Sequence, residues 1–125
     1  CTATGKAILA RLSTEELDDR LAKGPLPALT EHSITSIRAL RKVLDEVRET
    51  GHALDREEVI EGVVCVAVAI PGPDSSGQWM AISATLLTPR ATDALLDEVA
   101  AELHVVAAAI SVGLGRPVEL ERPAG

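Results

Sequence analysis

The chain of 125 residues contains neither phenylalanine nor tyrosine, and Trp79 is its one aromatic residue. Because 46% of the residues are nevertheless hydrophobic, the core has to be built from Leu, Val, Ile and Ala side chains. This composition is typical of a folded globular domain and not of a disordered chain. The length is sufficient for one domain with a sizeable core and too short for two.

Cysteine and positive charge are also scarce. Cys1 and Cys65 are too few for a disulfide framework, and they lack the second cluster that a zinc site requires. The net charge is −7 and no run of Lys or Arg occurs, which argues against nucleic-acid binding by this chain alone. The sequence shows no secretory leader and no apolar run of transmembrane length, so we expect no membrane partner and a reducing, cytoplasmic setting.

Two candidate strands, 63–70 and 79–86, sort their side chains by size onto opposite faces. Successive side chains of a strand point to opposite sides of the sheet. The bulkier face carries Val64, Val66, Val68, Ile70, Met80, Ile82, Ala84 and Leu86, whereas the small face carries Cys65, Ala67, Ala69, Ala81, Ser83 and Thr85. Such a sheet can pack a core behind it and hold a ligand in front. In the alternative interpretation, the small face lies under a helix whose backbone comes close.

The N-terminal half of the chain is predicted to be helical. Apolar spacing predicts a short helix over 4–12, and a capping box at Ser13 begins a second helix. Residues 23–33 contain glycine and prolines and are predicted to form a loop. A third helix is expected from residue 35 or 36 to residue 50, followed by Gly51 in the left-handed conformation.

The C-terminal half adds strands and one long helix. A short strand is predicted over 52–57, and residues 71–78 join the two sorted strands as a hairpin-type loop. Thr92 caps the last helix, which we expect to end at Gly115, with 116–125 as a frayed tail. Its apolar residues advance by alternating threes and fours, the spacing of a helix packed along a helix or sheet. They are Leu96, Val99, Leu103, Val106, Ile110 and Leu114.

Four separated segments of the chain occur in an order and spacing that resemble one known family. These segments are TATGKAILARL at 2–12, LTEHSIT at 29–35, HALDREEVIEGVVCVAVAI at 52–70 and MAISATLLT at 80–88. They resemble the effector-binding domain of IclR-type bacterial transcription regulators. The resemblance implies a GAF-like α/β domain of the α+β kind, with an antiparallel sheet flanked by helices. In the family, this domain binds a small molecule and controls an attached winged helix-turn-helix.

The resemblance also predicts which part of the family's protein this is. Residues 1–115 correspond to the effector-binding domain, incomplete at its N-terminal side, because family members carry further strands and a helix before the GKA motif. The DNA-binding domain precedes those elements, so DNA is expected to be a partner only through a segment outside this chain. A homodimer or homotetramer is the expected assembly, and no cofactor or metal is implied.

Family pocket positions fall on the small face of the sheet and on the start of the first helix. Residue by residue they are Ala3, Thr4, Gly5, Asp55, Cys65, Ser83 and Thr85. Unpaired backbone N–H groups around residues 4–6 favour a carboxylate, and an ionised Asp55 can only accept hydrogen bonds, as from a ligand hydroxyl or amine. The expected effector is therefore a small organic acid bearing a hydroxyl or keto group. Lys6 is expected to be solvated.

Each of these residues also has an ordinary structural explanation. Asp55 opens an acidic stretch that is typical of a surface turn, and a cysteine in an apolar strand, such as Cys65, is usually a packing residue. Ser83 and Thr85 can bond neighbouring strands. The ATGKA segment is not a phosphate-binding loop, because Ala7 stands where Ser or Thr must bind magnesium.

Three classes of function compete on the sequence alone. The first is the sensor domain of a transcription regulator, which is not an enzyme. The second is a small thiol or hydrolase-type enzyme using Cys65 with His52 or Asp55, which needs an exposed, activated thiolate. The third is an oligomerisation module with a vestigial pocket. The histidines His32, His52 and His104 lie in separate predicted elements, which favours surface positions over a metal site or a Cys-His dyad.

Overall fold

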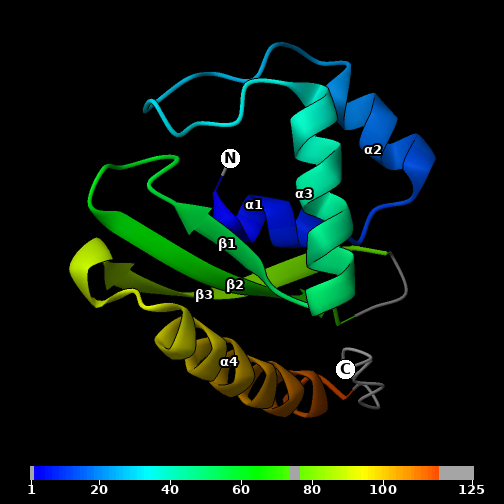
Figure 1. The fold of residues 1–125 in the computed structure, drawn as a ribbon. Helices are drawn as coiled ribbons and strands as arrows, with labels where there is room; N and C mark the ends of the chain where they lie inside the picture. Colours follow the sequence, from blue (N-terminus) through cyan, green and yellow to red (C-terminus); the bar gives the residue numbers. More distant parts are fainter. Residues whose placement is uncertain (1, 74–76, 116–125) are drawn as a thin grey trace.

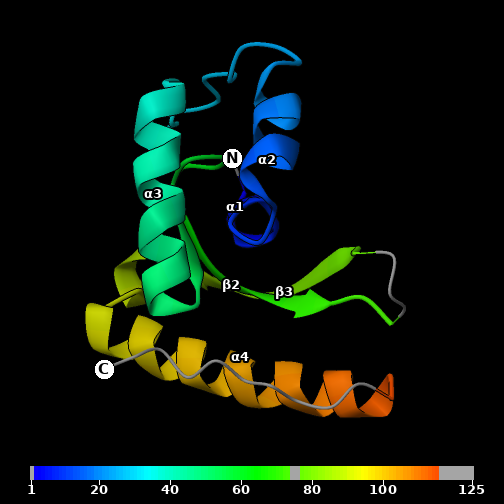
Figure 2. The same cartoon turned by 90° about the vertical axis from the view of Figure 1, so that its right-hand side faces the viewer.

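The computed structural model describes residues 2–73 and 77–115 of the chain. The elements in order are α1 (Ala3–Leu9), α2 (Thr14–Leu21), α3 (Ile37–Thr50), β1 (Ala53–Arg56), β2 (Val63–Pro71), β3 (Trp79–Leu87), the 3-10 turn η1 (Thr88–Arg90) and α4 (Asp93–Gly113). The strands form an antiparallel sheet in the order β1-β2-β3. Helices α1, α2 and α3 lie on one side of this sheet and α4 on the other (Figure 1 and Figure 2). The predicted α+β class is therefore confirmed.

A side-chain cap marks the start of each α-helix. Helix α1 begins one residue earlier than expected, because Thr2 caps it, and it ends at Leu9. Ser13 forms the predicted capping box of α2, and Ser36 caps α3. Gly51 ends α3 with φ at 84°, as its lack of a Cβ allows. Helix α4 ends at Gly113, slightly before the predicted residue, and the predicted tail over 116–125 lies outside the described residues.

The sorting of side chains by size matches the way the sheet is covered. On the bulky face, Val64 and Val66 pack with Leu96 of α4, and further along Val68 packs with Ala107. On the small face, Ala67 is fully buried in a cluster that includes residues of α1 and α3. The alternative interpretation, in which the small face lies under a close helix, therefore holds at Ala67. A pocket opens elsewhere on the same face.

The apolar seam predicted for α4 is correct for part of its length. Leu96, Leu103 and Ile110 pack against the sheet, but Val106 and Leu114 are 47% and 38% exposed. A straight α-helix drifts by about 20° per heptad from a strict 3.5-residue repeat. Smaller residues therefore complete the buried stripe, which includes Ala100, Ala107 and Ser111. Within the described ranges, no helix has the length and apolar character needed to cross a membrane.

Candidate functional site

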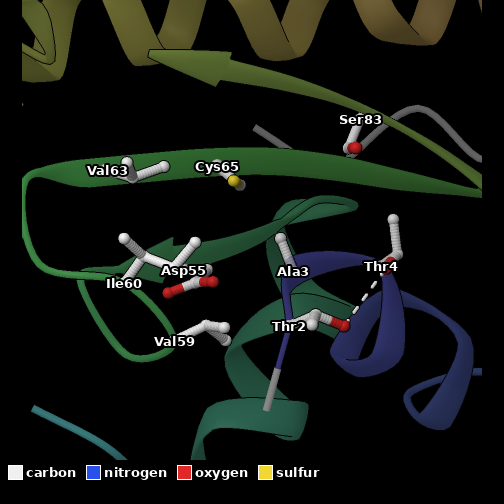
Figure 3. A pocket seen from close by; sticks show the side chains of 9 residues that line it. All are labelled: Thr2, Ala3, Thr4, Asp55, Val59, Ile60, Val63, Cys65 and Ser83. Carbon is white, nitrogen blue, oxygen red and sulfur yellow. Dashed lines mark hydrogen bonds between the residues drawn. The ribbon is translucent and has the colours of Figure 1, made fainter. Parts of the chain in front are cut away.

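A pocket of about 210 Å³ lies on the small face of the sheet, beside the first turn of α1. Its walls come from the start of α1, from all three strands and from residues 57–62, which connect β1 to β2 and which we call the acidic loop. The lining residues are Thr2, Ala3, Thr4, Asp55, Val59, Ile60, Val63, Cys65 and Ser83 (Figure 3). The pocket therefore joins segments that lie far apart in the sequence.

The strand register explains why polar residues from different strands share this pocket. Asp55 of β1 pairs with Cys65 of β2, which pairs in turn with Thr85 of β3. Ser83 is two positions from Thr85 on β3 and pairs with Ala67. Directly opposed residues on one face have Cβ atoms about 4.5–5.5 Å apart, so this register gathers the side chains on one surface.

The structure brings most of the predicted site residues together. Ala3, Thr4, Asp55, Cys65 and Ser83 all line the pocket, whereas Gly5 and Thr85 do not. The backbone N–H of Gly5 donates to Thr2 Oγ1 at 3.0 Å. Thr85 lies beside the pocket, with its Oγ1 3.4 Å from the Sγ of Cys65, so it contacts a lining residue.

The start of α1 differs from the expectation of unpaired N–H groups over residues 4–6. The N–H of Lys6 donates to the carbonyl oxygen of Thr2 at 3.0 Å, and the N–H of Gly5 is occupied by the Thr2 hydroxyl. The reason is that the helix begins one residue earlier than predicted, which makes Gly5 and Lys6 part of a closed turn. The hydroxyls of Thr2 and Thr4 lie 3.1 Å apart at this end of the pocket.

Asp55 is a buried carboxylate with one oxygen already bonded. Asp55 is only 5% exposed, and its Oδ1 accepts a hydrogen bond from the backbone N–H of Glu58 at 2.8 Å. An ionised carboxylate has about four acceptor positions on its two oxygens, so Asp55 retains capacity for a ligand donor. A solvated surface turn does not describe Asp55 or Glu58, since both are buried, although Glu61 of the same loop is exposed.

Lys6 is buried, so the expectation that it is solvated is wrong. It is 1% exposed, and its Nζ donates to Glu58 Oε2 at 2.6 Å and to the carbonyl oxygen of Leu54. The physical reason is that α1 lies directly on the sheet, so the side chain that points toward β1 has no path to solvent. The buried Glu58 replaces that solvent as the partner of the ammonium group.

Several residues of this site were not singled out from the sequence. Val63 could have been found, because it stands two positions before Cys65 and so shares its face of β2. Thr2 could have been found as a helix cap before the ATGK segment. Val59 and Ile60 lie in a loop, where no side-chain period applies, and no sequence signal identifies them as pocket residues.

Of the three histidines, His32 is exposed as expected, whereas His52 and His104 are partly buried. His52 stands one residue before β1 and three before Asp55, which is about 10 Å along a strand and on the alternate face. It therefore lies toward α4, and it does not form a dyad with Cys65. Among residues 2–73 and 77–115, no group of three His, Cys, Asp or Glu side chains could hold a metal ion.

His104 of α4 is partly buried, and its ring packs against Gly51 at the end of α3. Its Nε2 is buried and has no hydrogen-bond partner among the described residues. Burial lowers the pKa of His104 below its ordinary value, and the nearby charges of His52 and Arg11 lower it further. The guanidinium of Arg11 lies 5.8 Å from the centre of the Trp79 ring.

Residues 1–112 match the family described as bacterial transcriptional regulator IclR C-terminal. The chain belongs to this family. It is 40% identical over 115 residues to the HTH-type transcriptional regulator KdgR of Escherichia coli K12, covering 91% of this chain and 43% of KdgR. It is 37% identical to XynR of the same organism, covering 93% of this chain and 46% of XynR. The chain therefore spans less than half the length of these relatives, which are named as transcriptional regulators.

Solved structures of IclR-type regulators have the same fold. The C-terminal domain of E. coli KdgR matches with a TM-score of 0.82 and 37% identity, covering 91% of this chain and 69% of that chain. A double mutant of the inducer-binding domain of the PobR transcription factor from Acinetobacter, in complex with 3-hydroxybenzoic acid, matches with a TM-score of 0.76 and 30% identity. That match covers 87% of this chain and 62% of the PobR chain. The resemblance found in the sequence is confirmed at the level of family and fold.

Proposed function

We propose that this IclR C-terminal domain binds a small organic acid bearing a hydroxyl or keto group in the pocket beside α1. In the intact regulator, which acts in the cytoplasm, the bound acid changes the operator affinity of a winged helix-turn-helix outside this chain. The observation that carries the proposal is the convergence of a buried carboxylate, a thiol and hydroxyl groups on one small pocket.

The lining residues suit the separate parts of such a ligand. Asp55 can accept a hydrogen bond from a ligand hydroxyl, while Ser83 and the threonine hydroxyls of α1 can donate to a carboxylate. Val59 and Val63 supply an apolar wall for the ligand's carbon skeleton. A pocket of about 210 Å³ is smaller than the about 300–1,000 Å³ typical of drug-sized ligands, which favours a compact acid.

The bound ligand of PobR supports the same chemical class. 3-Hydroxybenzoic acid combines a carboxylate, a hydroxyl and an apolar ring, and it is held by the inducer-binding domain of a structural relative. For the present chain this acid is a test compound, chosen because its groups match the donors, the acceptor and the apolar wall of the pocket.

The competing functions receive less support. A thiol enzyme needs an activated thiolate, which is favoured by positively charged neighbours. The groups beside Cys65 are the Thr85 hydroxyl and the acidic Asp55, and His52 lies on the other face. A module for assembly alone does not account for a carboxylate buried at the edge of an open pocket. The homodimer or homotetramer stays a prediction, and the exposed Val105 and Val112 of α4 are available for such a contact.

Calorimetric titration of the intact regulator with small hydroxy, keto and aromatic acids, including 3-hydroxybenzoate, tests the proposal. Asp55→Ala should weaken the best-binding acid by about 1–3 kcal/mol, because the ligand's donor then lacks its partner. Ser83→Ala should weaken it by about 1 kcal/mol, since a neutral hydroxyl bond contributes less. Circular dichroism melting controls for folding. Equal affinities in wild type and Asp55→Ala would remove the pocket assignment.

A further inference from the structure

We propose that Lys6 and Glu58 are positioning residues of the pocket. Their buried ion pair holds the acidic loop against α1 and thereby fixes the carboxylate of Asp55. This inference rests on the proposed function and adds two residues that do not line the pocket themselves.

Glu58 connects the ion pair directly to Asp55. Its backbone N–H donates to Asp55 Oδ1 at 2.8 Å, while its side-chain Oε2 accepts from Lys6 Nζ at 2.6 Å and from the N–H of Arg56 at 3.2 Å. Both the main chain and the side chain of Glu58 are therefore held. The orientation of the Asp55 carboxylate depends on a residue whose own position is set by Lys6.

The segment 29–33 holds the acidic loop from its other side. The Thr30 hydroxyl donates to the carbonyl oxygen of Glu57 at 2.6 Å, and the Ser33 hydroxyl donates to that of Glu58 at 2.6 Å. Ser33 Oγ also accepts the N–H groups of Leu29 and Thr30, each at 2.9 Å. These bonds assign a role to the LTEHS segment that the sequence alone did not suggest.

The conformation of the loop needs such support. Glu57 has φ at 58°, in the left-handed region that non-glycine residues rarely adopt, and its side chain accepts the N–H of Gly62 at 2.8 Å. The loop carries Val59 and Ile60, which form one wall of the pocket. Without the bonds to Lys6, Thr30 and Ser33, we expect the strained loop to relax and the wall to move.

A purely stabilising role does not explain the ion pair. Buried ion pairs are often no more stabilising than apolar residues of similar volume, because both charges lose their hydration. Here Glu58 Oε1 is also buried, and it has no hydrogen-bond partner in the part of the chain that the structure describes. Fixed geometry is the property that the pair supplies and an apolar contact cannot. Lys6 also neutralises Glu58, so that the charge of Glu58 does not add to that of Asp55 beside the pocket.

The test uses the intact regulator with the double variant Lys6→Met/Glu58→Gln, which removes both charges at similar volume. Thr30→Val independently removes one bond to the loop. Matched controls are Lys42→Met/Glu46→Gln on the exposed side of α3 and the exposed Thr35→Val. The double variant avoids leaving a buried charge unpaired, and Thr30→Val keeps the test possible if the double variant does not fold.

Hydrogen exchange without ligand gives the first readout. We expect the amide of Glu58 and its loop neighbours to exchange at least about tenfold faster in both test variants, while the amides of β2 exchange as in the wild type. Unchanged exchange in the loop, or a uniform increase over the whole domain, would overturn the proposal.

Titration with 3-hydroxybenzoate and benzoate gives the second readout. We expect the ratio of the affinity for 3-hydroxybenzoate to that for benzoate, which depends on Asp55, to fall toward one in the test variants. The ratio should stay unchanged in the controls. A preference that survives in the test variants but is lost in Asp55→Ala would overturn the positioning role. If the wild type binds neither acid, the proposed function fails for this ligand, and the exchange experiment alone decides whether the ion pair holds the loop.

Discussion

His104 illustrates how one residue can make the stability of the domain depend on pH. Its pKa in the folded state lies below the ordinary value of 6.5, first because of burial and then because of the charges of His52 and Arg11. The unfolded chain therefore binds a proton at this residue more readily than the folded one does. Stability rises with pH wherever the unfolded state binds more protons, so it should fall as the pH drops from about 6.5 toward the folded pKa.

Replacing His104 should remove this dependence. We expect the free energy of unfolding in urea to fall less between about pH 7 and pH 5 in His104→Gln than in the wild type. His32→Gln serves as the control, because His32 has a side chain that is 49% exposed. A slope that changes equally in both variants would contradict the assignment to His104.

Residues of the site differ in how far their positions could be predicted. Asp55, Cys65 and Ser83 follow from strand alternation combined with the family resemblance, since side-chain period and register act locally. Lys6 and Glu58 were missed, because a charged residue is ordinarily exposed and an acidic run is ordinarily a surface turn. Their pairing spans 52 positions of sequence, and it exists only because α1 lies against the sheet.

At the scale of elements, acidic substitutions should unfold the domain in the packed region of the sheet and should be tolerated in its open region. Val66 and Ala67 are both fully buried, on opposite faces of β2, whereas Ser83 is exposed at the pocket. An unpaired buried charge costs several kcal/mol, which is a large part of the about 5–15 kcal/mol that stabilises most domains. Val66→Asp and Ala67→Asp should therefore prevent folding or lower the melting temperature sharply.

Ser83→Asp provides the matched comparison on the small face. It should melt close to the wild type, yet it should lose binding of acids because a second carboxylate then repels the ligand. Thermal melting followed by circular dichroism, together with titration, measures both effects. Wild-type melting of Ala67→Asp would show that α1 does not cover this part of the sheet.

Element boundaries were predicted best where a side chain caps a helix. Ser13 and Thr92 mark the starts of α2 and α4 as expected, because cap bonds depend on residues only three positions apart. The buried side of α4 was predicted less well. A strict repeat of threes and fours placed Val106 on the buried side, whereas the true helical period moves it toward solvent and buries Ala107.

At the scale of the whole molecule, the pocket and the DNA-binding surface are expected to be separate sites whose binding equilibria are coupled. The chain carries a net charge of −7 and is poorly suited to contact phosphates itself. A ligand can alter operator affinity only if it binds two states of the regulator differently, and the coupling must then be reciprocal. The factor by which the acid changes operator affinity should equal the factor by which the operator changes affinity for the acid.

This reciprocity gives a test in the intact regulator. Fluorescence anisotropy of a labelled operator, with and without the best-binding acid, measures one factor, and titration of the acid with and without operator measures the other. We expect Asp55→Ala to shift the effect of the acid on operator binding to higher acid concentration, by the same factor by which it weakens acid binding. Operator binding without acid should stay unchanged, because Asp55 lines the pocket and the operator is expected to contact a segment outside this chain. If the acid alters operator affinity at the same concentrations in Asp55→Ala as in the wild type, although its binding at the pocket is weaker, the signal arises at another site. Unequal factors in the wild type would mean that the two measurements do not report the same two-state equilibrium.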